Sequence, residues 1–174
     1  QRERARRIAY IPQPHRPTFG YTVLDTVLMG TTRTLSPFAP TKQAQVDMAM
    51  AAMERVGVTE LAERNFAHLS GGEQQLVLIA RAIAQQSDIL IMDEPTSALD
   101  YGNQLRILQQ VRALSREGYT VLLSTHNPQH ALTFADRVLA LHDGAVAANG
   151  SAKEVLTPEL IRRLYRVEAT LADT

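Results

Sequence analysis

The chain has 174 residues, of which 45% are hydrophobic and 21% are charged, and it contains no cysteine. This composition is typical of a folded globular domain, and it excludes intrinsic disorder, a disulfide framework and thiolate metal sites. The 18 basic and 18 acidic residues cancel, so no overall charge favours nucleic acid or a lipid surface, and no apolar run is long enough to cross a membrane.

The segment up to residue 86 is expected to contain one strand followed mainly by helices. Its arginine-rich start could form a basic arm for nucleic acid, but a solvated lead-in to the first strand is the simpler interpretation. Prolines indicate a loop after this strand, and apolar residues at helical spacing follow the loop. The expected elements are a strand at 7–11, a loop at 12–19, a helix from Val23 that stops at Gly30, a loop at 31–40, and a helix at 41–56 that buries Val46, Met50 and Met53 and ends at Gly57.

From residue 87 onward, short apolar strands alternate with helices. The run from Ile89 to Met92 contains no polar residue, which is typical of a strand covered on both faces. The alternation predicts a parallel sheet with helices on its faces, and the helical segment before it is an insertion into this α/β core. The expected elements are strands at 89–92, 121–123 (also buried) and 138–141, helices at 102–117, 128–135 and 152–165, and a turn at Asp143-Gly144 that leads into 145–148.

A serine, two glycines and a glutamate stand before the run of residues 74–85, which has helical spacing. Ser70 and Glu73 have the spacing of a capping box, so a helix is expected to begin here. A cap needs no glycine, whereas Gly71 and Gly72 would let another group approach the backbone closely. Free N–H groups at a helix N-terminus bind phosphate. Both a plain helix start and a phosphate-binding one are consistent with this segment taken alone.

Two carboxylates, Asp93 and Glu94, come directly after the apolar strand at 89–92. In open α/β sheets, ligands bind at the C-terminal ends of parallel strands. A strand that simply ends in polar turn residues is the plainer interpretation of this segment when it is taken alone.

In this order, the segments resemble the motifs of ATP-binding cassette (ABC) ATPases, and the resemblance covers essentially the whole chain. Residues 69–73 are similar to the signature motif, 89–94 to the Walker B motif and 97–100 to the D-loop. The resemblance implies ATP and Mg²⁺ as cofactors. It implies that Asp93 holds Mg²⁺, that Glu94 polarises the attacking water, and that Asp100 runs along a partner subunit and its ATP.

The same resemblance gives two isolated polar residues a role. His126 follows the strand at 120–124, where the family places its switch histidine on the γ-phosphate. Gln13 stands where the family has a residue that touches Mg²⁺ or the attacking water. The resemblance further implies that Ser70, Gly71, Gly72 and Glu73 face the nucleotide of a partner subunit. The remaining histidines are expected to be ordinary surface or structural residues, namely His15, His68, His130 and His142.

One family motif is missing from the printed sequence. The phosphate-binding loop reads G-x-x-x-x-G-K-[ST], and neither Lys42 nor Lys153 follows a glycine. We therefore expect an N-terminally truncated cassette of the P-loop NTPase type, in which the chain alone is inactive and binds ATP weakly. The expected organisation is a strand and glutamine loop at 1–19, a helical subdomain that ends in the signature helix at 20–86, and an α/β core with Walker B, D-loop, switch histidine and C-terminal helices at 87–174.

Residues 22–30 and 75–84 are similar to the ATPases of importers for iron–siderophores, haem, cobalamin and related ligands such as molybdate. The resemblance implies a peripheral protein on the cytoplasmic face of the membrane. Its expected partners are transmembrane permease subunits, a second ATPase subunit in a homodimer and, indirectly, a substrate-binding protein, but no nucleic acid. Two alternatives stay open: an ABC ATPase with a role other than transport, and an inert fragment that keeps only a docking surface.

Overall fold

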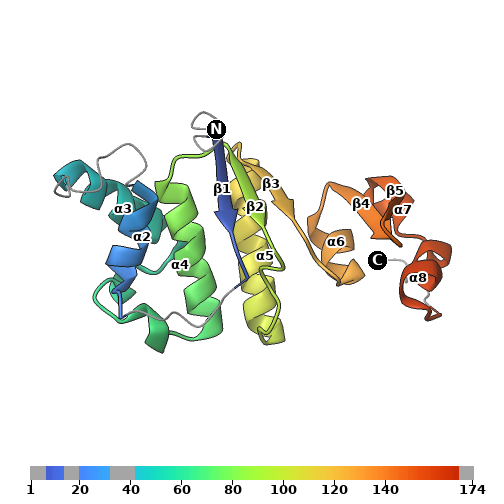
Figure 1. Ribbon diagram of the computed structural model, residues 1–174, viewed down its shortest axis with the longest axis horizontal. Coiled ribbons are helices and arrows are strands. Elements are labelled where there is room, and N and C mark those ends of the chain that lie inside the picture. The colour runs from blue at the N-terminus through green and yellow to red at the C-terminus, as the bar shows by residue number, and fades with distance from the viewer. Residues whose placement is uncertain (1–6, 14–19, 32–41, 169–174) are drawn as a thin grey trace. The chain divides into compact units, whose positions relative to one another are not determined.

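The computed structural model describes residues 7–13, 20–31 and 42–168 (Figure 1). These residues form two compact units, which are divided between Ser124 and Thr125. The N-terminal unit contains a parallel sheet and a layer of helices, and the C-terminal unit contains a β-hairpin and short helices. This architecture confirms the expected α/β fold with a helical segment. None of the described helices is long and apolar enough to span a membrane.

Three parallel strands form the sheet of the N-terminal unit, in the order β1-β2-β3. They are β1 (Ile8–Ile11), β2 (Ile89–Met92) and β3 (Thr120–Leu123). The register pairs Ile11 with Met92 and Met92 with Leu123, so the three strands end level with one another. The residues that follow each strand therefore emerge at one edge of the sheet, where open α/β sheets bind their ligands.

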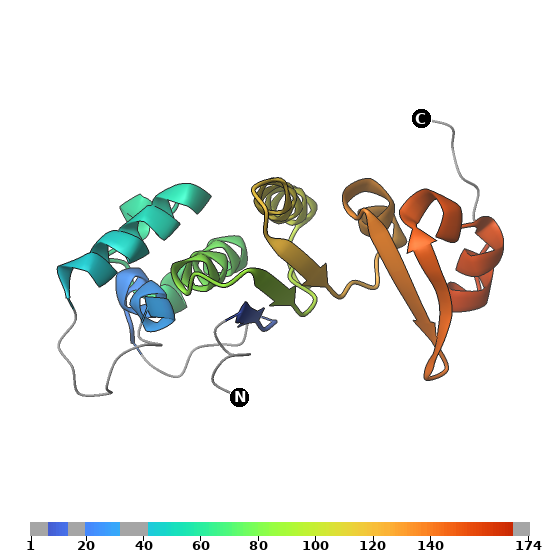
Figure 2. The same cartoon turned by 90° about the horizontal axis from the view of Figure 1, so that it is seen from above.

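Within the described residues of the N-terminal unit, helices cover only one face of this sheet. In Figure 2, α4 (Gly71–Ala84) and α5 (Tyr101–Arg116) lie on the same side of the strands. On the other face, the register places Tyr10, Ile91 and Leu122 in one row, and Tyr10 and Leu122 are 56% and 61% exposed. The expectation that β2 and β3 are buried on both faces is therefore wrong for the described residues. Their side chains alternate, as in a strand that is covered on one side.

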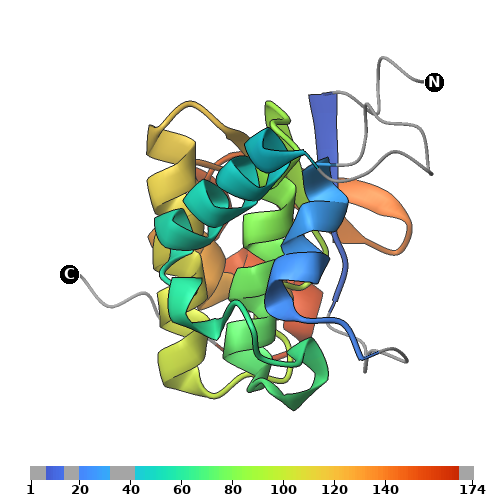
Figure 3. The ribbon, with the colours of Figure 1, turned by 90° about the vertical axis from the view of Figure 1, so that its left-hand side faces the viewer.

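The segment between β1 and β2 is helical, as expected. Both α2 (Val23–Thr31) and α3 (Gln43–Val56) pack against α4 (Figure 3). Short 3₁₀ turns at Thr59–Leu61 and Phe66–His68 lead from α3 into α4. Gly30 does not stop α2, contrary to expectation, because the helix continues to Thr31. A Cβ atom at Gly30 would collide with the backbone carbonyl of Arg81, so this glycine serves the close packing of α2 on α4.

The buried stripe of α3 is rotated from the expected one. Met53 is buried, but Val46 and Met50 are only partly so. The fully buried residues of this helix are Gln45, Ala49, Ala52, Met53 and Val56. The buried stripe therefore combines two small alanines with Met53 and Val56, while Val46 and Met50 lie at its margin. The helix ends as predicted at Gly57, which has a left-handed φ of 72°.

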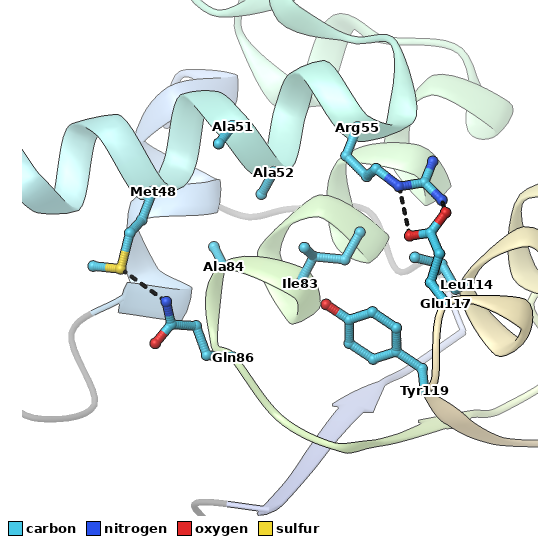
Figure 4. A pocket seen from close by; sticks show the side chains of 10 residues that line it. All are labelled: Met48, Ala51, Ala52, Arg55, Ile83, Ala84, Gln86, Leu114, Glu117 and Tyr119. Carbon is cyan, nitrogen blue, oxygen red and sulfur yellow. Dashed lines mark hydrogen bonds and ion pairs between the residues drawn. The ribbon is translucent and has the colours of Figure 1, made fainter.

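A cavity of about 320 Å³ lies where the C-terminal ends of α3, α4 and α5 meet (Figure 4). Its charged lining groups are paired with each other, because the Arg55 guanidinium donates to the Glu117 carboxylate through Nε, at 2.8 Å, and through Nη2. On the opposite side, the Gln86 amide donates to the sulfur of Met48 at 3.3 Å. The rest of the lining is Ala51, Ala52, Ile83, Ala84, Leu114 and Tyr119.

The C-terminal unit is built around an antiparallel hairpin. Its elements are α6 (Pro128–Phe134), β4 (Arg137–His142), β5 (Ala145–Ser151), α7 (Ala152–Val155) and α8 (Pro158–Tyr165). The turn predicted at Asp143-Gly144 is confirmed, but the strand expected at 138–141 in the parallel sheet pairs instead antiparallel with β5. The turn at Asp143 and Gly144, with φ of 49° and 74°, returns the chain at once and so favours the antiparallel partner.

The single helix expected at 152–165 is two helices. The chain leaves helical conformation at Leu156 and Thr157, and α8 begins at Pro158. Proline is favoured in the first turn of a helix because its missing N–H would have no partner there. The Thr157 hydroxyl accepts a hydrogen bond from the backbone N–H of Leu160 at 3.2 Å and so caps the second helix.

Candidate functional site

Two carboxylates emerge at the C-terminal edge of the parallel sheet, in the turn after β2. The backbone N–H of Asp93 donates to the carbonyl of Ile11 at 3.0 Å and thereby continues the ladder between β1 and β2. The carboxylate of Asp93 is exposed, whereas Glu94 is half-buried. Glu94 has a φ of 42°, a left-handed value that is unusual for a residue with a side chain. The backbone therefore turns sharply between the two carboxylates.

Ser124 joins these carboxylates from the end of β3, and the sequence did not reveal it as a site residue. Its hydroxyl donates to Oδ1 of Asp93 at 2.7 Å and accepts from the backbone N–H of Glu94 at 2.8 Å. One side chain thus fixes the orientation of the first carboxylate and the turn that carries the second. The Tyr10 hydroxyl of β1 also donates to Oδ2 of Asp93, at 3.4 Å.

Gln13 is tied to the same edge through a second serine. Its side-chain amide donates to the hydroxyl of Ser97 at 2.7 Å, and this hydroxyl donates to the backbone carbonyl of Glu94 at 2.9 Å. The structure therefore brings Gln13, Asp93 and Glu94 together, although Gln13 and Ser97 are separated by 84 positions in the chain. Like Ser124, Ser97 was not identified from the sequence as a residue that positions the site.

The oxygen atoms at this edge suit a hard cation. Carboxylate and amide oxygens are ligands that Mg²⁺ prefers, and Mg²⁺ usually keeps water and phosphate oxygens in its shell. Among residues 7–13, 20–31 and 42–168, no group of three acidic or histidine side chains could hold a metal ion by itself. An ion held here by Asp93 would therefore complete its coordination with water or with a phosphate ligand.

The N-terminus of α4 is held by a closed capping box, as predicted. The backbone N–H and the hydroxyl of Ser70 donate to Oε2 of Glu73 at 2.8 and 2.7 Å, and the Ser70 hydroxyl accepts from the backbone N–H of Glu73 at 3.4 Å. The hydrogen bonds from Ser70 lower the pKa of the Glu73 carboxyl. Glu73 thus turns back onto Ser70 and completes the cap.

The two glycines of this N-terminus face the segment that follows Glu94. A Cβ atom at Gly71 would lie 3.0 Å from Leu99, and one at Gly72 would lie 2.7 Å from Oδ1 of Asn103. Asp100 caps α5, because its carboxylate accepts from the backbone N–H and the side-chain amide of Asn103 at 2.9 and 2.6 Å. These hydrogen bonds lower the pKa of Asp100. Close packing between the two helix starts therefore accounts for at least Gly72.

His126 belongs to the C-terminal unit, so its role beside the carboxylates stays a prediction. Its backbone carbonyl accepts a hydrogen bond from the hydroxyl of Tyr165 at 2.9 Å. His130 lies in α6 and is 5% exposed. Burial, and to a lesser extent the charge of His126, lower the pKa of His130. His130 is therefore a neutral, buried residue, in agreement with its expected structural character.

The model of the family described as ABC transporter matches residues 1–97 of this chain. An ABC transporter ATP-binding protein of Haemophilus influenzae, whose name calls it uncharacterized, is 43% identical over 97% of the chain and 64% of its own length. The molybdate import ATP-binding protein MolC of the same species is 38% identical over 92% of the chain and 63% of its own length.

Solved structures agree with these sequence relatives. An inward-facing transporter, described as being of the metal-chelate type, superposes with a TM-score of 0.89 at 37% identity, and the match covers 93% of this chain and 64% of that chain. The chain therefore spans less than two thirds of the length of these similar proteins. The family model matches more than half of the chain, and the fold superposes on that of a solved ABC transporter. These two findings show that this protein belongs to the ABC transporter family.

Proposed function

We propose that the protein of which this chain is part is the ATP-hydrolysing subunit of an ABC importer. The observation that carries the proposal is the pair of carboxylates at the C-terminal edge of the sheet, with Asp93 oriented by Ser124 and Glu94 in a strained turn. A ligand at this edge would meet both carboxylates at once. Such a pair suits hydrolysis of a phosphoanhydride, where one group serves the metal and the other serves the attacking water.

In this proposal each carboxylate has one task. Asp93 would hold Mg²⁺, directly or through water, and the ion would neutralise charge on the β- and γ-phosphates. Glu94 would accept a proton from the attacking water, and Gln13 would help to place that water or the ion. His126 would contact the γ-phosphate. Catalysis of this kind depends mainly on position, so a small displacement of these groups would slow turnover strongly.

The N-terminus of α4 would serve a second subunit. Free N–H groups at the start of α4, around Gly71 and Gly72, would donate to the phosphates of an ATP held by the partner, while Asp100 would border the same interface. We further propose a homodimer that attaches to transmembrane permease subunits on the cytoplasmic face. For the chain itself we propose the organisation expected from the sequence. A strand and glutamine loop reach to residue 19, a helical subdomain spans 20–86, and the α/β core begins at residue 87.

Substitution of Glu94 by glutamine in the intact protein tests the catalytic proposal. Glu94→Gln keeps the shape of the side chain but removes the base, so hydrolysis should fall by about 10²- to 10⁴-fold while ATP binding is retained. Glu63→Gln is a matched control, because Glu63 is exposed on the loop between α3 and α4 and should leave turnover unchanged. Turnover of Glu94→Gln near that of the wild type would remove Glu94 from the proposed role.

The transport class needs a separate experiment in cells. The names of the relatives point to a molybdate importer and to a transporter of the metal-chelate type. We therefore propose a ligand of this chemical group: an iron–siderophore, haem, cobalamin or an oxyanion such as molybdate. Deletion of the intact gene should abolish uptake of one of these labelled ligands. Normal uptake of all of them, with loss of a sugar or an amino acid instead, would refute the ligand class and leave the ATPase proposal intact.

A further inference from the structure

The last helix of the described chain reaches back to the backbone of His126. The hydroxyl of Tyr165, at the C-terminal end of α8, donates a hydrogen bond of 2.9 Å to the carbonyl oxygen of His126. The two residues are 39 positions apart but lie in the same compact unit. Burial raises the pKa of Tyr165, so its hydroxyl keeps its proton and remains a donor at neutral pH.

The hydrogen bonds that Asn127 makes in the same loop are local. The backbone N–H of Asn127 donates to the Thr125 hydroxyl at 3.0 Å, and the Asn127 side chain accepts from the backbone N–H groups of Gln129 and His130 at 2.9 and 3.4 Å. These bonds shape the start of α6 but connect only neighbours in the chain. Tyr165 is different because it attaches the loop to a distant element, which limits how far the loop can shift as a body.

The element that carries Tyr165 is itself well anchored. Leu160 and Ile161 of α8 are each 8% exposed and pack in the apolar cluster of the C-terminal unit. Thr157 caps the start of the helix. At its other end, Arg166 adopts a left-handed φ of 58°, and its backbone N–H donates to the carbonyl of Arg162 at 2.9 Å. The helix thus ends directly after Tyr165, and its buried side is packed in that cluster.

We propose that Tyr165 is a positioning residue for His126. By fixing the carbonyl of His126, it fixes the point from which the imidazole extends and so the place where that ring meets a phosphate. The inference rests on the role of His126 in the proposed function. It extends that function to the C-terminal helix, because any partner or contact that displaces α8 would also displace His126.

The test uses the intact protein and a substitution that removes only the hydroxyl. Tyr165→Phe should lower the kcat of ATP hydrolysis about three- to tenfold, since one hydrogen bond is lost, with little change in KM. Tyr119→Phe is the matched control, because Tyr119 immediately precedes β3, at the end of the sheet opposite to the carboxylates. This control should leave kcat unchanged.

A double-mutant cycle separates positioning from a general structural effect. If Tyr165 acts through His126, Tyr165→Phe should cause no further loss of kcat in a His126→Ala background. An equal loss of kcat in both backgrounds would overturn the inference about Tyr165. So would an unchanged kcat of Tyr165→Phe if His126→Ala is strongly impaired. Either result would leave the proposed function intact. Unchanged turnover of His126→Ala would instead refute the proposed role of His126. Melting temperatures of all variants identify any loss that results from unfolding.

Discussion

The edge of the sheet and the N-terminus of α4 are both proposed to meet nucleotide, but they are built in different ways. At the sheet edge, Asp93 is held by a serine 31 positions away, and Gln13 binds a serine 84 positions away. At the start of α4, Ser70 and Glu73 are three positions apart and satisfy each other. The hydrogen bonds at the sheet edge exist only when the strands are in register. The capping box, in contrast, needs only the first turn of α4 to form.

Among the substitutions that test this comparison, the largest effect is expected from Ser124→Ala at the sheet edge. The carboxylate of Asp93 would lose its shortest hydrogen bond, and the backbone N–H of Glu94 would lose its acceptor. Both carboxylates would then be less well placed, so ATP turnover of the intact protein should fall about 10- to 100-fold. Steady-state kinetics would measure this loss.

Ser115→Ala provides the control for that substitution. The hydroxyl of Ser115 donates a hydrogen bond to the carbonyl of Arg112 at 3.1 Å, but it lies near the C-terminal end of α5. Turnover should be unaffected. Equal turnover for the two serine variants would mean that the bonds of Ser124 to the carboxylate turn do not matter for catalysis.

An intermediate effect is expected from Gly72→Ala, which tests the contact between the two helix starts. The new methyl group would overlap the side chain of Asn103, so the free energy of unfolding should fall by about 1–3 kcal/mol. Denaturant titration would measure it. Shortening the neighbour with Asn103→Ala should reduce this cost. Gly102→Ala is the control, because a Cβ atom there would meet only an ordinary contact at 3.4 Å. If Gly72→Ala and Gly102→Ala lower the free energy of unfolding to the same extent, the contact between Gly72 and Asn103 is not the cause of the loss.

The smallest effect on stability is expected from the capping box of α4. Ser70→Ala should lower the free energy of unfolding by about 1 kcal/mol. The pKa of Glu73 is depressed in the folded state, so its contribution is present above the ordinary glutamate pKa of about 4.5 and is lost as the pH falls below it. The stability difference between wild type and Ser70→Ala should therefore shrink in acid.

A similar cap at the start of α7 is a matched control. Ser151 and Glu154 make two of these bonds, from the Ser151 hydroxyl to the Glu154 carboxylate at 2.7 Å and from the Glu154 backbone N–H to that hydroxyl at 3.4 Å, and hydrogen bonds from Ser151 lower the pKa of Glu154. Ser151→Ala should cost similar stability but leave ATP turnover unchanged, whereas Ser70→Ala should also slow turnover. If both variants slow turnover to the same degree, the cap of α4 has no special place in the nucleotide site.

The same contrast explains how much could be predicted from the sequence. The capping box, the carboxylates after β2 and the left-handed Gly57 follow from residues that are neighbours in the chain, and the structure has all of them. The partner Ser124 could not be found in this way, because an isolated serine after a strand has no pattern of its own. Ser97 lies in the segment similar to the D-loop, but that resemblance does not reveal its hydrogen bond with Gln13. Only the register of β2 and β3 brings Ser124 to Asp93.

The errors have a similar origin. Gly30 was expected to end a helix, but its environment is the backbone of α4, which is distant in sequence. Leu122 was expected to be buried because its strand is apolar, but apolar composition does not reveal which faces of a strand are covered. The break before Pro158, in contrast, was visible in the sequence as a threonine–proline pair that favours a new helix start.

The pairing of β1 with β2 also affects the order in which parts of the fold can form while the chain is being synthesised. Arg7 and Asp88, at the starts of the two strands, form an ion pair although 81 positions separate them. A ribosome that adds about 5–20 residues per second needs about 4–16 s to make the intervening chain. The residues of α2, α3 and α4 are all added within that interval. The helical layer can therefore assemble on the nascent chain before β1 meets β2, and the carboxylate edge forms only after β3 has followed.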